Sequence, residues 1–402
     1  MALKIGGVSF TFAAILVLSA LSSILLGNVL PPDDLGEFVF LRMLVLFIAP
    51  LTIWGQDIAT ARYFSANDVR QYRWDVTFLR IMSVSVPLVF VAIVIIYFVF
   101  HLSFYKLVGL FIASVFYCAT LFFSSLLRSQ RRFSLAIFML NGFRGLFFLF
   151  LVIVHFAGTI TKYHAMFVYL VVIVLMTLFN ALYTFKKVPR GTKFVPREMH
   201  TFGLILMGIE ASIVVMTSMD SMFIKKILGD SSLALYQMTL VPGQAFRILN
   251  RAAKYVWVPE FARAQRVRFK AMNAAVAVVA FVLFIFIVVA AHPILDFLFK
   301  GKYNAGVPLL RVFALVGVIR LFYSLTSSLI MGRLSQRALH YHLGLNIVGL
   351  ILYVFVLYYF LILFGVLGAG FALLILSVIK LIGSYIIIFC FREQVQSPGA
   401  VN

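Results

Sequence analysis

The chain has 402 residues, of which 63% are hydrophobic and only 12% are charged, with a mean hydropathy of +1.08. A soluble domain is about 45–50% apolar and about 25% charged, so the composition excludes a soluble protein and predicts an integral membrane protein. The net charge of +21 would suggest a nucleic-acid partner in a soluble chain. Here cytoplasmic loops rich in lysine and arginine explain it, and no nucleic-acid partner is expected.

Twelve apolar stretches match the length of about 20 residues that a helix needs to cross a bilayer. Because they are continuously apolar and not alternating, they favour helices over barrel strands. The sequence thus predicts an all-α membrane protein in two six-helix lobes, residues 1–190 and 191–402. The predicted spans are 8–30, 36–58, 80–100, 107–127, 134–156, 165–184, 202–224, 233–256, 271–291, 306–331, 342–363 and 367–391.

Lysine and arginine are concentrated in alternate loops and near both termini. The basic loops are 62–80, 128–132, 186–197, 251–270 and 333–337, with Lys4 and Arg392 at the ends. By the positive-inside rule these loops are cytoplasmic, which places both termini inside, as an even number of spans requires. The first span is expected to stay in the protein, because Lys4 is its only flanking charge and its apolar run exceeds that of a signal peptide.

The stretch Phe202–Phe261 resembles a second beginning of the chain. Its turn at 227–236 matches the turn at 29–38, with leucine or aromatic residues at corresponding positions. Ser-Gln-Arg follows the fourth span at 129–131 and the tenth at 335–337, and prolines interrupt the second and eighth spans at Pro50 and Pro242. Two halves with the same number of spans and the same orientation predict a parallel repeat about an axis along the membrane normal.

Charged residues inside the spans are the candidate functional residues, because a charge at mid-membrane costs roughly 2.5–3.5 kcal/mol and normally faces protein or a wet cavity. Four arginines lie deep, and two further basic residues lie nearer span ends, where they could snorkel to the surface. Each deep arginine either lines a cavity or belongs to a structural ion pair. The deep arginines are Arg42, Arg144, Arg247 and Arg320, and the other two residues are Arg311 and Lys380.

Three acids within spans, Asp57, Glu210 and Asp220, cannot neutralise this positive charge. Asp57 is also placed to pair with Arg62. An excess of arginine favours an anionic ligand such as pyrophosphate, which guanidinium groups bind bidentately. The acids are candidates for binding H⁺ or Na⁺ as a coupling ion, and no other cofactor is expected.

Catalytic motifs are missing from the sequence. There is no Walker motif, nucleophile elbow or metal-spaced cluster, and the longest predicted outer loop has about ten residues. Asp33 and Asp34 follow prolines and are interpreted as a helix start. His340 and His342 are interpreted as interfacial residues, and the two cysteines predict neither a disulfide nor a metal site. These features predict a protein that is not an enzyme.

Several short motifs, in order, resemble one family. They are Leu30–Phe38, Gly55–Tyr63, the segment from Asp220 through Tyr236, and Leu298–Ala305 followed by two leucines. Together they are similar to the Wzx-type polysaccharide flippases of the MOP superfamily, relatives of MATE antiporters and lipid II flippases. The resemblance covers nearly the whole chain, without the two extra helices of the lipid II type.

The resemblance implies two lobes around a central cavity that opens to each side in turn, in a bacterial inner membrane. The implied substrate is an undecaprenyl-pyrophosphate-linked oligosaccharide for O-antigen, capsule or exopolysaccharide. Membrane lipid and the polysaccharide polymerase or chain-length machinery are the further partners. Pro50 and Pro242 would be hinges. Two alternatives stay open: a MATE-like exporter of small cationic drugs, and a membrane-embedded polysaccharide polymerase.

Overall fold

The computed structural model describes residues 2–130, 132–263 and 269–391. Within these ranges the description excludes the side chains of residues 2–12, of 62, 65 and 66, of 332 and 336, and of many positions in 202–217 and 244–270.

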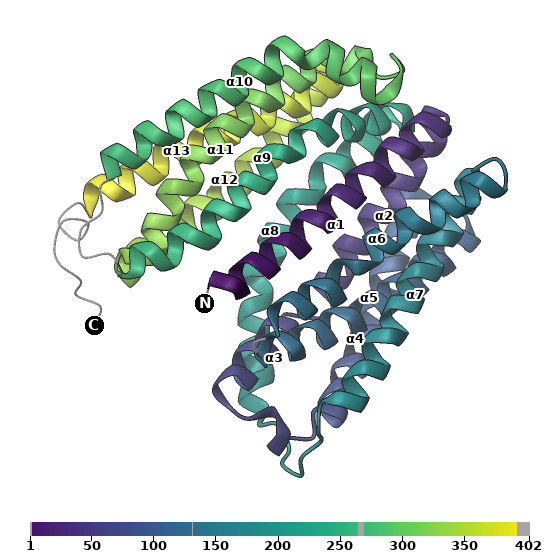
Figure 1. Ribbon diagram of the computed structural model, residues 1–402, viewed down its shortest axis with the longest axis vertical. Coiled ribbons are helices and arrows are strands. Elements are labelled where there is room, and N and C mark those ends of the chain that lie inside the picture. The colour runs from purple at the N-terminus through teal and green to yellow at the C-terminus, as the bar shows by residue number, and fades with distance from the viewer. Residues whose placement is uncertain (1, 131, 264–268, 392–402) are drawn as a thin grey trace. The chain divides into compact units, whose positions relative to one another are not determined.

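In the described part of the chain, a single helix covers each predicted span except the second, which is divided between two helices (Figure 1). The helices are α1 (Ala2–Val29), α2 (Pro32–Thr52), α3 (Gln56–Ala66), α4 (Trp74–Phe100), α5 (Phe104–Ser129), α6 (Phe133–Ala157), α7 (Lys162–Lys187), α8 (Arg197–Leu228), α9 (Asp230–Arg263), α10 (Phe269–Phe299), α11 (Val307–Arg333), α12 (Gln336–Phe364) and α13 (Val366–Cys390). Two short 3₁₀ turns cover Val69–Gln71 and Asn304–Gly306. The prediction of an all-helical membrane protein is confirmed.

Large apolar side chains are exposed along the helices, as a lipid-facing surface requires. Phe98, Phe156 and Phe297 are 68%, 85% and 86% exposed. On a water-soluble protein such a surface would be an aggregation liability, whereas hydrocarbon is its natural solvent. Together with the length and apolarity of the helices, this exposure indicates a multi-pass membrane protein.

The chain forms two compact units, Met1–Met222 and Phe223–Asn402. It passes from one to the other within α8, whereas the predicted lobes divide earlier, between residues 190 and 191. The purple-to-teal and green-to-yellow helices of Figure 1 correspond broadly to the two units. Each unit is described below by itself.

In the first unit α5 is the central helix. It packs against α2, α3, α4, α6 and α7, while α1 packs against α6. The buried side of α5 is rich in small residues, among them Ala113, Ser114 and Ala119, which let neighbouring backbones approach closely. Thr120 and Thr177 join α5 to α7 through hydroxyls 2.7 Å apart.

In the second unit α11 takes the central position, packing against α9, α10, α12 and α13. Thr326 and Ser384 join α11 to α13 through hydroxyls 2.7 Å apart, which repeats the α5–α7 contact on the equivalent helices. Phe38 and Tyr236, matched in the predicted repeat, are each 1% exposed. The internal repeat therefore extends from the sequence to the packing.

The second predicted span is broken. Helix α2 ends at Thr52, two residues after Pro50, and α3 starts at Gln56. Between them Trp54 and Gly55 have positive φ angles of 47° and 71°. The single span predicted for 36–58 is wrong in this detail, because proline weakens the helix that contains it and the glycine accepts the left-handed conformation. In contrast, α9 is helical throughout, including Pro242.

The break is fixed against the start of α8. Gln56, fully buried, donates from Nε2 to the carbonyl of His200 (3.0 Å), and its Oε1 accepts from Nδ1 of His200 (2.9 Å). The Trp54 and His200 rings stack with centroids 5.9 Å apart. A side chain at Gly55 would meet the Gly203 carbonyl oxygen at 2.2 Å. These contacts hold α3 and α8 in one arrangement.

Candidate functional site

Arg42 and Arg144 belong to the first unit, on α2 and α6, and both are half-buried. The Arg42 guanidinium carbon lies 5.8 Å from the centre of the Phe38 ring, one helical turn earlier. The Arg144 guanidinium carbon lies 5.6 Å from the ring of Phe143. Contact with an aromatic face partly offsets the cost of holding a cation among apolar side chains.

Tyr169 on α7 connects the two arginines. Its ring is 6.0 Å from the Phe38 ring and 6.0 Å from the Phe143 ring, in edge-to-face contacts. The charges of Arg42 and Arg144 both act on the Tyr169 hydroxyl, and the two arginines repel each other. Two of the predicted site residues are thus brought together around one aromatic cluster.

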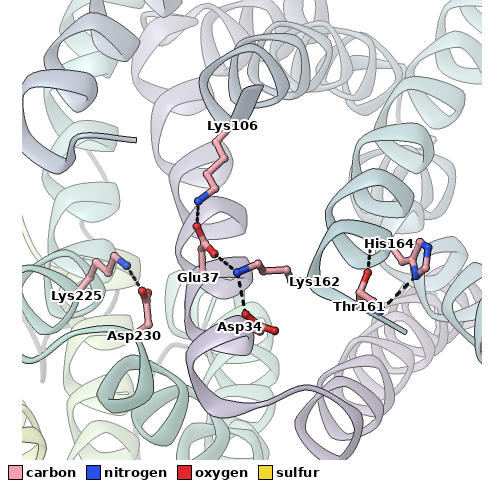
Figure 2. A network of polar contacts seen from close by, with 8 residues as sticks. All are labelled: Asp34, Glu37, Lys106, Thr161, Lys162, His164, Lys225 and Asp230. Atoms are coloured by element: carbon pink, nitrogen blue, oxygen red, sulfur yellow. Dashed lines mark hydrogen bonds and ion pairs between the residues drawn. The ribbon is translucent and has the colours of Figure 1, made fainter. Parts of the chain in front are cut away.

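Within the part of the chain whose side chains are described, no carboxylate forms an ion pair with Arg42 or Arg144. The acids nearest to Arg42 along α2 are already paired. Glu37 contacts Lys106 and lies 3.2 Å from Lys162, and Asp34 lies 2.9 Å from Lys162 (Figure 2). These two acids are therefore not available to neutralise Arg42.

Asp33 and Asp34 lie in the first turn of α2, after Pro31 at the N-cap and Pro32 at the first helical position. Their interpretation as a helix start is confirmed. Figure 2 adds that Asp34 also contributes to the ion-pair network that joins the starts of α2, α5 and α7.

In the second unit Arg320 lies on α11 and Lys380 lies on the neighbouring helix α13. The Arg320 Nε donates to the Ser377 hydroxyl (3.3 Å), and Lys380, three residues after Ser377, is 5% exposed. A Cβ placed on Gly349 of α12 would lie 3.5 Å from the Lys380 Cε. Lys380 therefore belongs to the interior of the unit, and its interpretation as a snorkelling residue does not fit its burial, whereas Arg320 is half-buried.

Polar side chains continue from Arg320 along α11. The Tyr323 hydroxyl donates to Asn346 (3.3 Å), and Ser324 donates to Asn250 (3.1 Å). His342, in the second turn of α12, is buried and lies 3.2 Å from Ser327, and its interpretation as a residue at the membrane interface stays a prediction. His340 is exposed.

Of the remaining predicted residues, Asp57 is near the first group, since its charge and that of Arg144 both act on Tyr117 of α5. Arg311 is exposed in the second turn of α11. Asp57 is half-buried at the start of α3, where the charge of Arg128 acts on it, and Asp220 is buried on α8. The side chains of Arg247, Glu210 and Arg62 lie outside the described residues.

Tyr169 and Tyr117 were not among the sequence candidates. Tyr117 is 6% exposed, its ring lies 5.5 Å from the Phe143 ring, and the charge of Arg144 acts on it. Tyrosines are common in membrane helices, so their presence alone gave no signal. The only sequence feature that could have pointed to them is that they lie in the same half of the chain as Arg42 and Arg144.

Comparison with known proteins assigns the chain to a family. A family model described as polysaccharide biosynthesis protein matches residues 5–265, so the chain belongs to this family. This confirms the family resemblance found in the sequence. Among curated protein sequences, none matches the chain.

Solved structures of MOP superfamily proteins share the fold. The lipid II flippase MurJ in an inward closed conformation matches with a TM-score of 0.72 and 13% identity, covering 96% of this chain and 87% of that one. An inward-facing multidrug resistance MATE transporter matches with a TM-score of 0.68 and 15% identity, covering 96% and 99%. A MOP superfamily transporter from Pyrococcus furiosus, with a binding pocket described as having reverse polarity, matches with a TM-score of 0.59 and 16% identity, covering 98% and 95%. At these identities the likeness establishes the MOP fold.

Proposed function

We propose that this protein is a flippase that moves undecaprenyl-pyrophosphate-linked oligosaccharide units from the cytoplasmic to the periplasmic leaflet of a bacterial inner membrane. The units would serve export of a surface polysaccharide such as O-antigen, capsule or exopolysaccharide. Membership of a polysaccharide biosynthesis family and a fold shared with a lipid II flippase support this function. A transporter, not an enzyme, is the class that both favour.

The observation that carries the proposal is the pair Arg42 and Arg144, held around Tyr169 without a described carboxylate partner. A half-buried cation without a carboxylate partner among the described side chains favours an anionic ligand. Guanidinium groups bind phosphate oxygens in a fork geometry, so pyrophosphate is the best match. Arg320, Lys380 and Arg247 are proposed as the anion-binding basic residues of the second unit.

The path of the substrate follows from its chemistry. The oligosaccharide needs a wet interior, whereas the polyprenyl chain is soluble in lipid and has no reason to leave it. Alternating access with hinges near Pro50 and Pro242 would then move the pyrophosphate and sugar across. A proton or Na⁺ bound at Asp57, Glu210 or Asp220 is the proposed coupling ion, and polymerase or chain-length proteins are proposed partners.

The test uses purified full-length protein in liposomes that contain a labelled polyprenyl-pyrophosphate oligosaccharide, and it measures accessibility of the label on the far leaflet. Arg42→Ala and Arg144→Ala should each reduce movement at least tenfold, because a hydrogen bond to a charged group contributes about 1.5–3 kcal/mol. Arg→Lys should restore part of it, since lysine keeps the charge but loses the fork.

Arg70→Ala is the matched control, because Arg70 is exposed in a loop of the same unit. It should transport as the wild type does. Normal movement in both alanine variants would disprove the role of the arginine pair.

A MATE-like exporter of cationic drugs is the second candidate, favoured by the likeness to a multidrug MATE transporter. Its binding residues should be acidic, whereas the residues gathered around Tyr169 are basic. Uptake of a cationic dye into the same liposomes separates the two functions: dye transport without movement of the lipid-linked sugar would favour the exporter.

A further inference from the structure

The ring of Tyr169 is surrounded by aromatic neighbours. Besides Phe38 and Phe143, it contacts Phe147 in an edge-to-face arrangement at 5.5 Å, and Phe147 stacks on Phe38 at 5.7 Å. The residue is 5% exposed. Because three rings from α2 and α6 enclose it, its hydroxyl has little freedom to turn toward another partner.

The Tyr169 hydroxyl has no hydrogen-bond partner among the described residues. Buried polar groups in proteins are nearly always satisfied, since an unpaired one has lost its bonds to water without replacement. A phenylalanine would fill the same aromatic cluster without this cost. The hydroxyl is therefore better explained by a ligand than by packing.

Two positive charges act on this hydroxyl, from Arg42 on α2 and from Arg144 on α6. A cationic ligand would be repelled there, and a neutral sugar would leave both charges uncompensated. An anion with several oxygens can accept from two guanidinium groups and from a phenol at once. Phosphate and pyrophosphate have this shape and charge.

We propose that the Tyr169 hydroxyl is a third donor of the anion site and hydrogen-bonds a phosphate oxygen held between Arg42 and Arg144. The inference rests on the proposed function and adds a neutral donor to its charged pair. Since α2, α6 and α7 all belong to the first unit, this part of the site is complete within that unit.

The experiment measures binding of inorganic pyrophosphate to full-length protein in nanodiscs by calorimetry, and repeats it with undecaprenyl pyrophosphate in the nanodisc lipid. Tyr169→Phe keeps every ring contact and removes one oxygen. Tyr303→Phe is the matched control: Tyr303 is 2% exposed, its hydroxyl also has no described partner, and it contacts Phe299 at 5.2 Å in the second unit.

The expected result is about tenfold weaker binding of both probes by Tyr169→Phe, with a melting temperature equal to or above that of the wild type. A structural role would instead lower the melting temperature. Tyr303→Phe should bind both probes normally. Equal weakening for the free and the lipid-linked anion would assign recognition to the phosphate itself, as proposed, whereas an effect on the lipid-linked probe alone would contradict a bond to phosphate.

The two levels of the hypothesis fail differently. If Tyr169→Phe binds pyrophosphate as tightly as the wild type while Arg42→Ala and Arg144→Ala do not, the role of Tyr169 is wrong and the arginine site stands. If the arginine variants also bind normally, or the wild type does not bind either probe, the proposed site is wrong and the role of Tyr169 falls with it.

Discussion

Two glycines with left-handed backbone separate the cost of conformation from the cost of packing. Gly55 has φ +71° and Gly229 has φ +87°. A Cβ on Gly229 would have nothing within 4 Å, whereas a Cβ on Gly55 would meet the Gly203 oxygen at 2.2 Å and the Met207 nitrogen at 2.7 Å. Both substitutions force an L residue into a disfavoured region, but only Gly55→Ala also requires two backbones to move apart.

Gly229→Ala should therefore lower the free energy of unfolding by about 1–2 kcal/mol, the cost of the left-handed conformation alone. Gly55→Ala should cost about 2–5 kcal/mol once overpacking is added. Thermal unfolding of both variants in the same detergent shows which substitution lowers the melting temperature more. Equal shifts in melting temperature would mean that the contact between the α2–α3 break and α8 contributes nothing.

At the same scale, the sequence could single out the unusual charges but neither how deeply each is buried nor what surrounds it: Lys380 was expected to be able to snorkel, yet it is 5% exposed. Arg42 and Arg144 stand out because arginine is rare in an apolar span. Tyr169 does not stand out, because its meaning depends on three phenylalanines from two other helices. The ion pairs of Glu37 and Asp34 with Lys106 and Lys162 likewise join segments far apart in the chain. Such long-range pairings cannot be predicted from one sequence by spacing.

Among the elements, the junction of α3 with α8 is a pH-sensitive contact. Because the Gln56 Nε2 donates to the His200 carbonyl, its Oε1 is left to accept, so His200 Nδ1 carries a proton in this contact. Burial, and then the charge of Arg80, lower the pKa of His200 from its ordinary value of 6.5. The folded protein thus prefers neutral His200.

Linkage gives the direction in which stability changes with pH, because a base whose pKa is lowered on folding takes up its proton more readily in the unfolded chain. Its contribution to stability is complete above pH 6.5 and declines as the pH falls below 6.5 toward the folded pKa. The melting temperature of the wild type should therefore decrease over this range, and that of His200→Gln should decrease less. Parallel curves for the two proteins would contradict the assignment.

The helices themselves were predictable, since every predicted span except the broken second one is a single helix in the described chain, and the spans differ from the structure mainly by extensions beyond the apolar run. Those extensions, such as α8 and α9 reaching past their predicted ends, are amphipathic or polar turns that hydropathy cannot assign. The break after Pro50 had a sequence signal in proline followed by glycine. Pro242 shows why that signal is weak: Gly243 follows it directly, and yet α9 continues through both residues.

For the whole molecule, the repeat describes the scaffold but not the charges. The hydroxyl contacts Thr120–Thr177 and Thr326–Ser384 fall on equivalent helices. In contrast, the candidate basic residues Arg42 and Arg144 lie on α2 and α6 in the first unit, whereas Arg320 and Lys380 lie on α11 and α13 in the second. The positions of the candidate charges therefore do not follow the internal repeat.

The fold also suggests a test of how the whole chain is oriented in the membrane. The starts of α2, α5 and α7 are joined by ion pairs at one end of the first unit (Figure 2). The loops before α4 and after α7 meet through the bridge between Tyr72 and Lys193. This second group is rich in arginine and lysine, so the positive-inside rule predicts that it faces the cytoplasm.

Single cysteines test this directly in a chain with Cys118→Ala and Cys390→Ser. Ser103→Cys and Lys186→Cys introduce exposed thiols, before α5 and at the end of α7. A membrane-impermeant maleimide should label Ser103→Cys in intact cells and Lys186→Cys only after the inner membrane is opened. Since α7 crosses from the ion-paired end to the basic end, the opposite pattern would invert the whole topology. An inverted topology would also contradict the proposed direction of transport. The end of the first unit expected to face the cytoplasm would then face the periplasm, so Arg42 and Arg144 would meet their substrate from that side.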